Sequence, residues 1–180
     1  MKKLIFLGII AGLGLYGYNN YFGPTAKTYR AAYEAYEIFA DFVLKEEWGE
    51  AAYYVIGDSQ ADSILKQGIK RSAKKLQKGN ISLNIQKPAI YYAKRTVQSR
   101  SISADGQEVT FSIVQQSRTG PAGQKRASVK PDLWESWQDV VVINTEDGWA
   151  VEKFEEVKEI IEEGGAIPFK PDNAVKKFFN

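Results

Sequence analysis

The chain of 180 residues contains no cysteine and no histidine. The missing cysteine excludes a disulfide framework, a thiolate nucleophile, an iron–sulfur site and a lipidated N-terminal cysteine. The missing histidine removes the commonest general base near neutral pH and the commonest metal ligand. Acid–base chemistry would need carboxylates, tyrosines or lysines with strongly shifted pKa values. We therefore expect a protein that is not an enzyme.

The chain also has little net charge, because 24 basic residues face 22 acidic ones and leave a formal charge of +2. The whole molecule is not a polyelectrolyte, so the sequence predicts no nucleic-acid partner. It carries no phosphate-binding loop, no metal-ligand motif and no nucleophile triad, and we expect no cofactor and no metal. A hydrophobic share of 44% and a charged share of 26% are typical of one folded domain with appendages.

One long apolar run stands at the amino terminus. Lys2 and Lys3 precede residues 4–22, which carry no charge and as a helix span about 28 Å, close to the hydrocarbon thickness of a bilayer. The positive-inside rule places the N-terminus in the cytoplasm. We predict a transmembrane anchor over residues 1–23, in a bacterial inner membrane that the chain crosses once, with the remainder periplasmic or otherwise extracytoplasmic. The alternative is a signal peptide cleaved near residues 12–14.

Gly8 and Gly12 form a small-xxx-small pair within this run. This spacing lets two helix backbones approach closely in lipid, and it marks a candidate packing face against another membrane helix. The alternative is that a short apolar export segment is simply rich in glycine.

Residues 24–163 are predicted to form one extracytoplasmic domain. Apolar residues recur first at helical spacing and then at a period of two, which favours an α+β fold with about three helices packed on a curved antiparallel sheet. The helices are expected at residues 25–45, 48–56 and 59–77, followed by a short acidic helix at 155–163. The strands are expected at residues 81–85, 89–103, 108–116, 134–144 and 149–154.

The segment Asp147-Gly148-Trp149-Ala150-Val151-Glu152-Lys153-Phe154, after three leading helices, resembles the last strand of the nuclear transport factor 2-like superfamily of cone-shaped, SnoaL-like domains. The resemblance covers roughly residues 25–157. It implies a cone whose mouth lies between the sheet and the helices. The superfamily contains enzymes, ligand binders and pure interaction domains, so the fold does not set the function. Its membrane-anchored members include the periplasmic assembly subunit of type IV secretion systems and membrane proteins associated with lipid importers.

Within such a cone, family enzymes commonly use Asp, His or Tyr as the acid–base group. The candidates on inner faces are Tyr36, Asp41, Tyr53, Tyr91 and Tyr92. The alternative is that the tyrosines are core residues with a hydrated hydroxyl and that Asp41 belongs to the polar side of its helix. On the last two strands we assign Trp149 to the core and leave Trp134 open between core and interface anchor.

A candidate interaction stripe follows from a spacing of four in the third helix: Lys66, Lys70, Lys74 and Lys78. Such a stripe suits anionic lipid or an acidic protein surface. The alternative is a solvated helix face.

Residues 164–180 form a tail in which Pro168 and Pro171 exclude regular helix and central-strand pairing. Its apolar residues mark a segment that docks on a partner or folds back on its own domain: Ile167, Phe169, Phe178 and Phe179. Together these features predict a non-catalytic scaffold or accessory subunit of a membrane protein complex, whose partners are the membrane and other subunits. The alternatives are a cone that binds a small ligand or lipid and, third, an isomerase- or dehydratase-like enzyme.

Overall fold

The computed structural model describes residues 23–78, 89–120 and 129–166. Several predictions concern the rest of the chain, and they stay predictions because they lie outside the described residues: the anchor at residues 1–22 with Gly8 and Gly12, the strand at 81–85, and the tail residues Ile167, Phe169, Phe178 and Phe179. No helix within the described ranges is both long and apolar enough to cross a membrane.

The helical half of the domain matches the expected elements closely. Helix α2 spans Pro24–Leu44 and begins with a proline in its first turn, where the missing amide donor costs no hydrogen bond. Helix α3 spans Trp48–Ala51 and continues as a short 3-10 turn over Ala52–Tyr54. Helix α4 spans Gln60–Lys78.

Four long strands form one antiparallel sheet in the order β1-β2-β4-β5, so the predicted α+β class is confirmed for the described residues. Gly106 and Gly148 sit at positive φ in the β1–β2 and β4–β5 turns, as expected for hairpins. The strands are β1 (Ala89–Ile102), β2 (Glu108–Gly120), β4 (Leu133–Thr145) and β5 (Gly148–Glu162), and a separate pair is formed by β3 (Val129–Lys130) and β6 (Gly165–Ala166).

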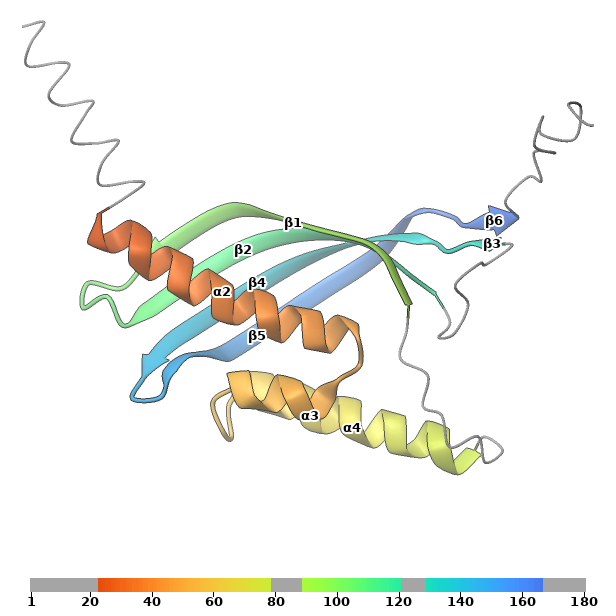
Figure 1. Cartoon of the computed structure of the whole chain (residues 1–180), viewed down its shortest axis with the longest axis horizontal. Coiled ribbons are helices and arrows are strands. Elements are labelled where there is room, and N and C mark those ends of the chain that lie inside the picture. Colours follow the sequence, from red (N-terminus) through yellow and green to blue (C-terminus); the bar gives the residue numbers. More distant parts are fainter. Residues whose placement is uncertain (1–22, 79–88, 121–128, 167–180) are drawn as a thin grey trace, which may run out of the picture.

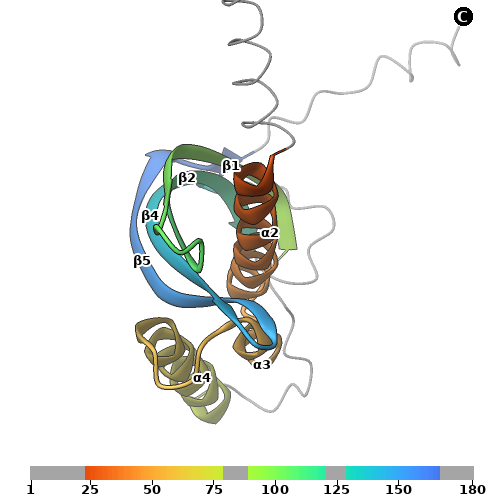
Figure 2. The same ribbon diagram turned by 90° about the vertical axis from the view of Figure 1, so that its left-hand side faces the viewer.

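The sheet curves around α2, which crosses its inner face, and α4 lies below β5 (Figures 1 and 2). Alternate residues of β2, β4 and β5 point inward, as the period of two requires. They meet the apolar side of α2 in a core that includes Tyr36, Phe39, Phe111, Val140, Val142, Val151 and Phe154. Beyond Leu44 the strands continue past the end of α2 (Figure 1). The helices therefore cover only part of the inner face.

The acidic helix predicted at residues 155–163 is wrong, because β5 continues as a strand to Glu162. Val157, Ile160 and Ile161 have the spacing of a helical face, which misleads a local interpretation. In the fold the segment pairs with β4, where Trp137 lies opposite Val157 and Trp134 opposite Ile160. The ladder hydrogen bonds to β4 outweigh the modest helix preference of the glutamates, since tertiary context routinely overrides propensity.

Candidate functional site

The inner face of the sheet changes from apolar to polar along each strand. In β2 the inward positions run from Phe111 and Ile113 to Gln115 and Ser117, and in β4 they run from Val140 to Gln138 and Ser136. All four polar side chains are buried. Since a buried amide or hydroxyl is costly unless it is hydrogen-bonded, this polar end of the core needs a network of partners.

Tyr36 anchors that network from α2. Its hydroxyl donates a short hydrogen bond to Oε1 of Gln138, and Nε2 of Gln138 donates to Ser136 Oγ at 3.1 Å and to Glu156 Oε1 at 3.0 Å. Burial, the largest cause, raises the pKa of Tyr36 far above its ordinary value of 10.0, and the nearby Arg95 only partly opposes the shift. The Tyr36 hydroxyl is thus a neutral hydrogen-bond donor that already has an acceptor.

Arg95 of β1 forms a second group of polar contacts, which joins α2 to β2. Its side chain is only 7% exposed, and its Nη1 lies 2.7 Å from Oδ1 of Asp41 in an ion pair. Its Nε donates to Oε1 of Gln115 at 2.6 Å. The remaining nitrogen, Nη2, is buried and has no hydrogen-bond partner within the described ranges. Since Oε1 of Gln115 already accepts a hydrogen bond from Arg95, the side-chain amide nitrogen of Gln115 is the group that can donate to a further partner.

A cavity of about 510 Å³ opens between α2, α4 and this polar end of the sheet. Trp48 forms one apolar wall, fixed by a 3.0 Å hydrogen bond from its Nε1 to Ser72 Oγ and by contact with Gly68. Gln115, Gln138 and Glu156 form the polar base, and Arg71 and Lys158 add positive charge. The cavity therefore combines an aromatic wall with an amide donor and a carboxylate.

The predicted acid–base candidates divide between the core and the surface. Tyr36 and Asp41 do reach the polar network, but both are engaged there with Gln138 and Arg95. Tyr53 was expected on an inner face and is instead 82% exposed, and Tyr92 is also exposed. The Tyr91 side chain lies outside what is described.

The three tryptophans of β4 and β5 lie in different environments. Trp149, which the sequence assigns to the core, packs against the core but is itself only partly buried. Trp134 is covered by the ammonium of Lys158, 5.0 Å from the ring centre, a cation–π distance. Trp137 points to the opposite face of the sheet and is 40% exposed.

The interaction stripe on α4 stays a prediction. Lys66 forms ion pairs with Asp62 at 2.6 Å and with Asp58 at 3.3 Å, and the hydrogen bond that Lys66 donates to Asp62 raises the pKa of Lys66. The charge of Lys66 is therefore balanced by two carboxylates that lie just before the lysines in the chain. Lys70 is exposed, and the side chains of Lys74 and Lys78 are outside the described set.

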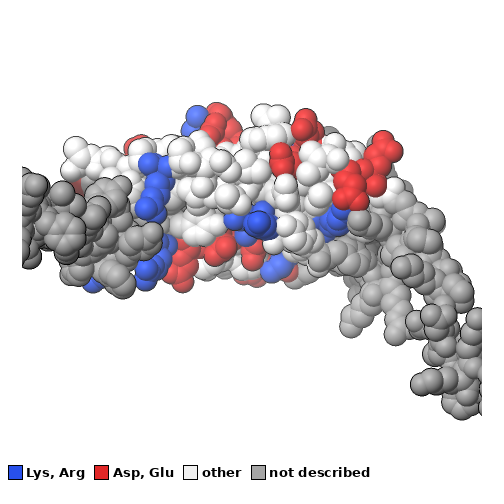
Figure 3. Space-filling model, turned by 90° about the horizontal axis from the view of Figure 1, so that it is seen from above, with Lys and Arg blue, Asp and Glu red and all other residues white. Residues whose placement is uncertain are grey.

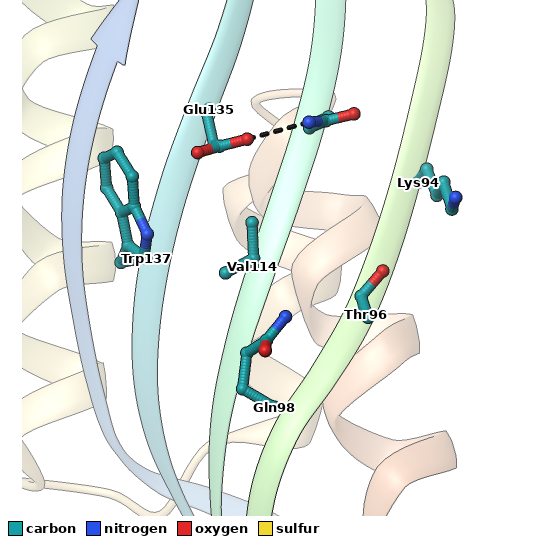
Figure 4. A pocket seen from close by; sticks show the side chains of 7 residues that line it. Lys94, Thr96, Gln98, Val114, Glu135 and Trp137 are labelled. Atoms are coloured by element: carbon teal, nitrogen blue, oxygen red, sulfur yellow. Dashed lines mark hydrogen bonds between the residues drawn. The ribbon is translucent and has the colours of Figure 1, made fainter.

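The outer face of the sheet carries a row of four cross-strand neighbours, three of which are apolar. Thr96, Val114, Trp137 and Val157 are consecutive partners in β1, β2, β4 and β5. A shallow depression of about 490 Å³ lies along this row, and Figure 4 shows the helices on the far side of the sheet from it. Glu135 accepts a 2.7 Å hydrogen bond from Gln116 beside it. From above, the molecule shows a broad uncharged area, with acidic side chains gathered toward the right-hand end (Figure 3).

The last part of β5 is exposed on both faces, although it pairs with β4 throughout. Val157 is 70% exposed, and Ile160 and Ile161 are also exposed. We call Trp137 together with residues 155–162 the uncovered end of the sheet. It combines large apolar side chains with glutamates, and on its inner side Glu156 and Lys158 line the cavity opposite residues of α4.

Four residues of the polar network are not among the predicted site residues: Arg95, Gln115, Gln138 and Glu156. A signal for two of them was present, because Gln115 and Gln138 continue the inward alternation of otherwise apolar strands. No local signal marks Arg95, since its partners Asp41 and Gln115 are distant in sequence. Comparisons with protein-family models, with curated proteins and with solved structures find no match for this chain.

Proposed function

We propose that this protein is a non-catalytic, single-pass scaffold or accessory subunit of an inner-membrane protein complex. Residues 1–23 anchor it in the membrane, and a cone-shaped domain of the nuclear transport factor 2-like type presents the uncovered end of the sheet to a partner protein. The uncharged run of residues 4–22 supports the anchor, and three helices on a four-stranded antiparallel sheet suit the cone.

The observation that carries this proposal is the exposure of Trp137 and Val157, at 40% and 70%, as neighbours on the outer face. Single exposed apolar residues are ordinary, but here Ile161 is exposed four residues further along the strand, and Ile160 is exposed at an inward position of the same segment. An aromatic anchor in an apolar patch with a charged rim is the usual composition of a protein–protein interface. The polar groups of the interior, in contrast, are mostly bonded to one another.

Affinity purification of the full-length protein from detergent-solubilised membranes tests the proposal. Trp137→Glu places a charge in the patch and should remove the partner, while Tyr53→Glu, at an exposed position of the helical half, should retain it. Equal recovery of co-purified protein from wild type and from Trp137→Glu, with both folded, would overturn the proposal.

The cavity favours a second candidate, a domain that binds a small ligand or lipid. Trp48 and Phe154 supply apolar walls, while the Gln115 amide and the Glu156 carboxylate supply a donor and an acceptor at the base. This is the usual composition of a ligand pocket. Native mass spectrometry would then show added mass on the wild type that is lost in Gln67→Trp, which narrows the cavity. If the wild type and Gln67→Trp both show only the mass of the protein without a ligand, this candidate is excluded.

A further inference from the structure

The edge of β5 is covered in its first half and uncovered in its second. β5 is the last strand in the sheet order, so one of its edges faces no strand of that sheet. Near the start, Val55 bridges Val151 and the amide of Ile56 donates to the Val151 carbonyl at 3.1 Å. Next, the Gln60 side chain bonds both the amide and the carbonyl of Phe154. No comparable contact follows within the described ranges.

The backbone groups beyond Phe154 keep a regular outward orientation. Along an antiparallel edge strand every second residue turns its N–H and C=O away from the neighbouring strand. Phe154 does so toward Gln60, and the register with β4 has no shift between residues 154 and 160. Glu156, Lys158 and Ile160 therefore present three amides and three carbonyls in one row, ready to pair with another strand.

The charge of this edge selects its partner. Residues 155–163 contain five glutamates and one lysine, and although Glu155 pairs with Lys153 and Glu162 with Arg118, the segment stays acidic, so a second copy of the same edge would bring like charges together. Natural edge strands use charge to prevent self-pairing. An extended segment that is itself basic meets no such repulsion, and apolar side chains in it would cover Val157 and Ile161.

We propose that an extended, basic segment of a partner protein adds to the edge of β5 as a fifth strand, with its apolar side chains against Val157 and Ile161. This inference rests on the proposed function and names the chemistry of the partner. Main-chain hydrogen bonds supply affinity in such strand addition, and the alternating side chains supply specificity. The glutamates supply long-range attraction, so binding should weaken as salt is raised.

Fluorescence anisotropy with the full-length protein in detergent tests the strand addition. The probe is a short capped peptide of alternating lysine and valine, and its matched control carries an N-methyl group on every amide. Both peptides have the same charge, but the methylated one cannot donate a backbone hydrogen bond along either edge. The unmodified peptide should bind about tenfold more tightly, since losing two hydrogen bonds costs roughly 1.4 kcal/mol.

Lys158→Pro tests the same point from the protein side. The Lys158 amide points away from β4, so proline removes an edge donor without removing a bond of the sheet, a position where strands tolerate proline. It should weaken binding of the unmodified peptide about tenfold, because the added strand loses its register at that point. Lys158→Gln keeps the amide and should bind at least as well as the wild type.

Four results would overturn the proposal. Equal binding of both peptides would mean that charge attraction, and not strand addition, holds the peptide. No binding until residues 167–180 are deleted would make the chain's own tail the occupant. Self-association that Lys158→Pro abolishes, without peptide binding, would make a second copy the occupant. If Lys158→Pro keeps its co-purified partner while Trp137→Glu loses it, the strand addition is wrong and the proposed function stands.

Discussion

Gln60 of α4 holds the edge of β5 at Phe154 through two hydrogen bonds. Phe154 donates its amide to Gln60 Oε1 at 2.8 Å, and Gln60 Nε2 donates to the Phe154 carbonyl at 3.2 Å. The side-chain carboxamide of Gln60 thus makes the two hydrogen bonds that the backbone of a neighbouring strand would make. Because the Phe154 side chain lies in the core beside Phe39, with ring centres 5.3 Å apart, this contact fixes α4 against the end of the covered sheet.

Gln60→Leu should destabilise the domain by about 1–2 kcal/mol, because it removes both hydrogen bonds from a partly buried backbone. Gln67→Leu makes the same change on α4 at a residue with no such bond and should stay within about 0.5 kcal/mol of wild type. Urea unfolding measures both. Amide exchange of Phe154 should accelerate only in Gln60→Leu, and unchanged exchange would show that the bonds do not protect this edge.

Tyr36→Phe should cost about 1–3 kcal/mol at neutral pH, since Gln138 Oε1 loses its buried donor. The pKa of Tyr36 is raised above 10.0 in the folded state. Above pH 10 an unfolded tyrosine therefore ionises while the folded one stays neutral, and wild-type stability falls. Tyr36→Phe has no hydroxyl to ionise at this position. The difference in unfolding free energy between wild type and variant should therefore narrow as pH rises from 10. A gap independent of pH would contradict the buried, neutral hydroxyl.

Gly68→Ala should destabilise the protein by roughly 1–3 kcal/mol, although alanine favours helix. A Cβ at this position would lie 2.8 Å from the Trp48 ring, which is held in place by Ser72. Gly49→Ala is the matched control, because nothing lies within 4 Å of its Cβ, and it should be neutral or slightly stabilising. Thermal melts compare the two, and similar shifts would mean that Trp48 is free to move.

The predicted anchor should be retained in the mature protein. The run of residues 4–22 is long enough to span a bilayer, carries no charge and is directly preceded by Lys2 and Lys3. The full-length chain should therefore stay in the membrane fraction after carbonate extraction. Mass spectrometry of the mature N-terminus is the check, and a terminus at Leu15 would show a cleaved export signal instead.

The helices and hairpins were predictable because their signals are local. Pro24 marks the start of α2, and glycines with positive φ mark both hairpin turns. The course of residues 155–162 was not predictable, because their glutamates and isoleucines have helical spacing and only pairing with β4 makes them a strand. The Arg95–Asp41 pair and the exposure of Trp137 likewise depend on elements brought together from distant parts of the chain.

Site-specific photo-crosslinking in the cells that produce the protein tests the central claim most directly. A photoreactive residue at position 157 lies in the uncovered end of the sheet, whereas one at position 53 lies on the helical half, where Tyr53 is 82% exposed. The account predicts a discrete crosslinked protein partner from position 157 and none from position 53. No adduct at position 157, or equal adducts at both positions, would contradict it.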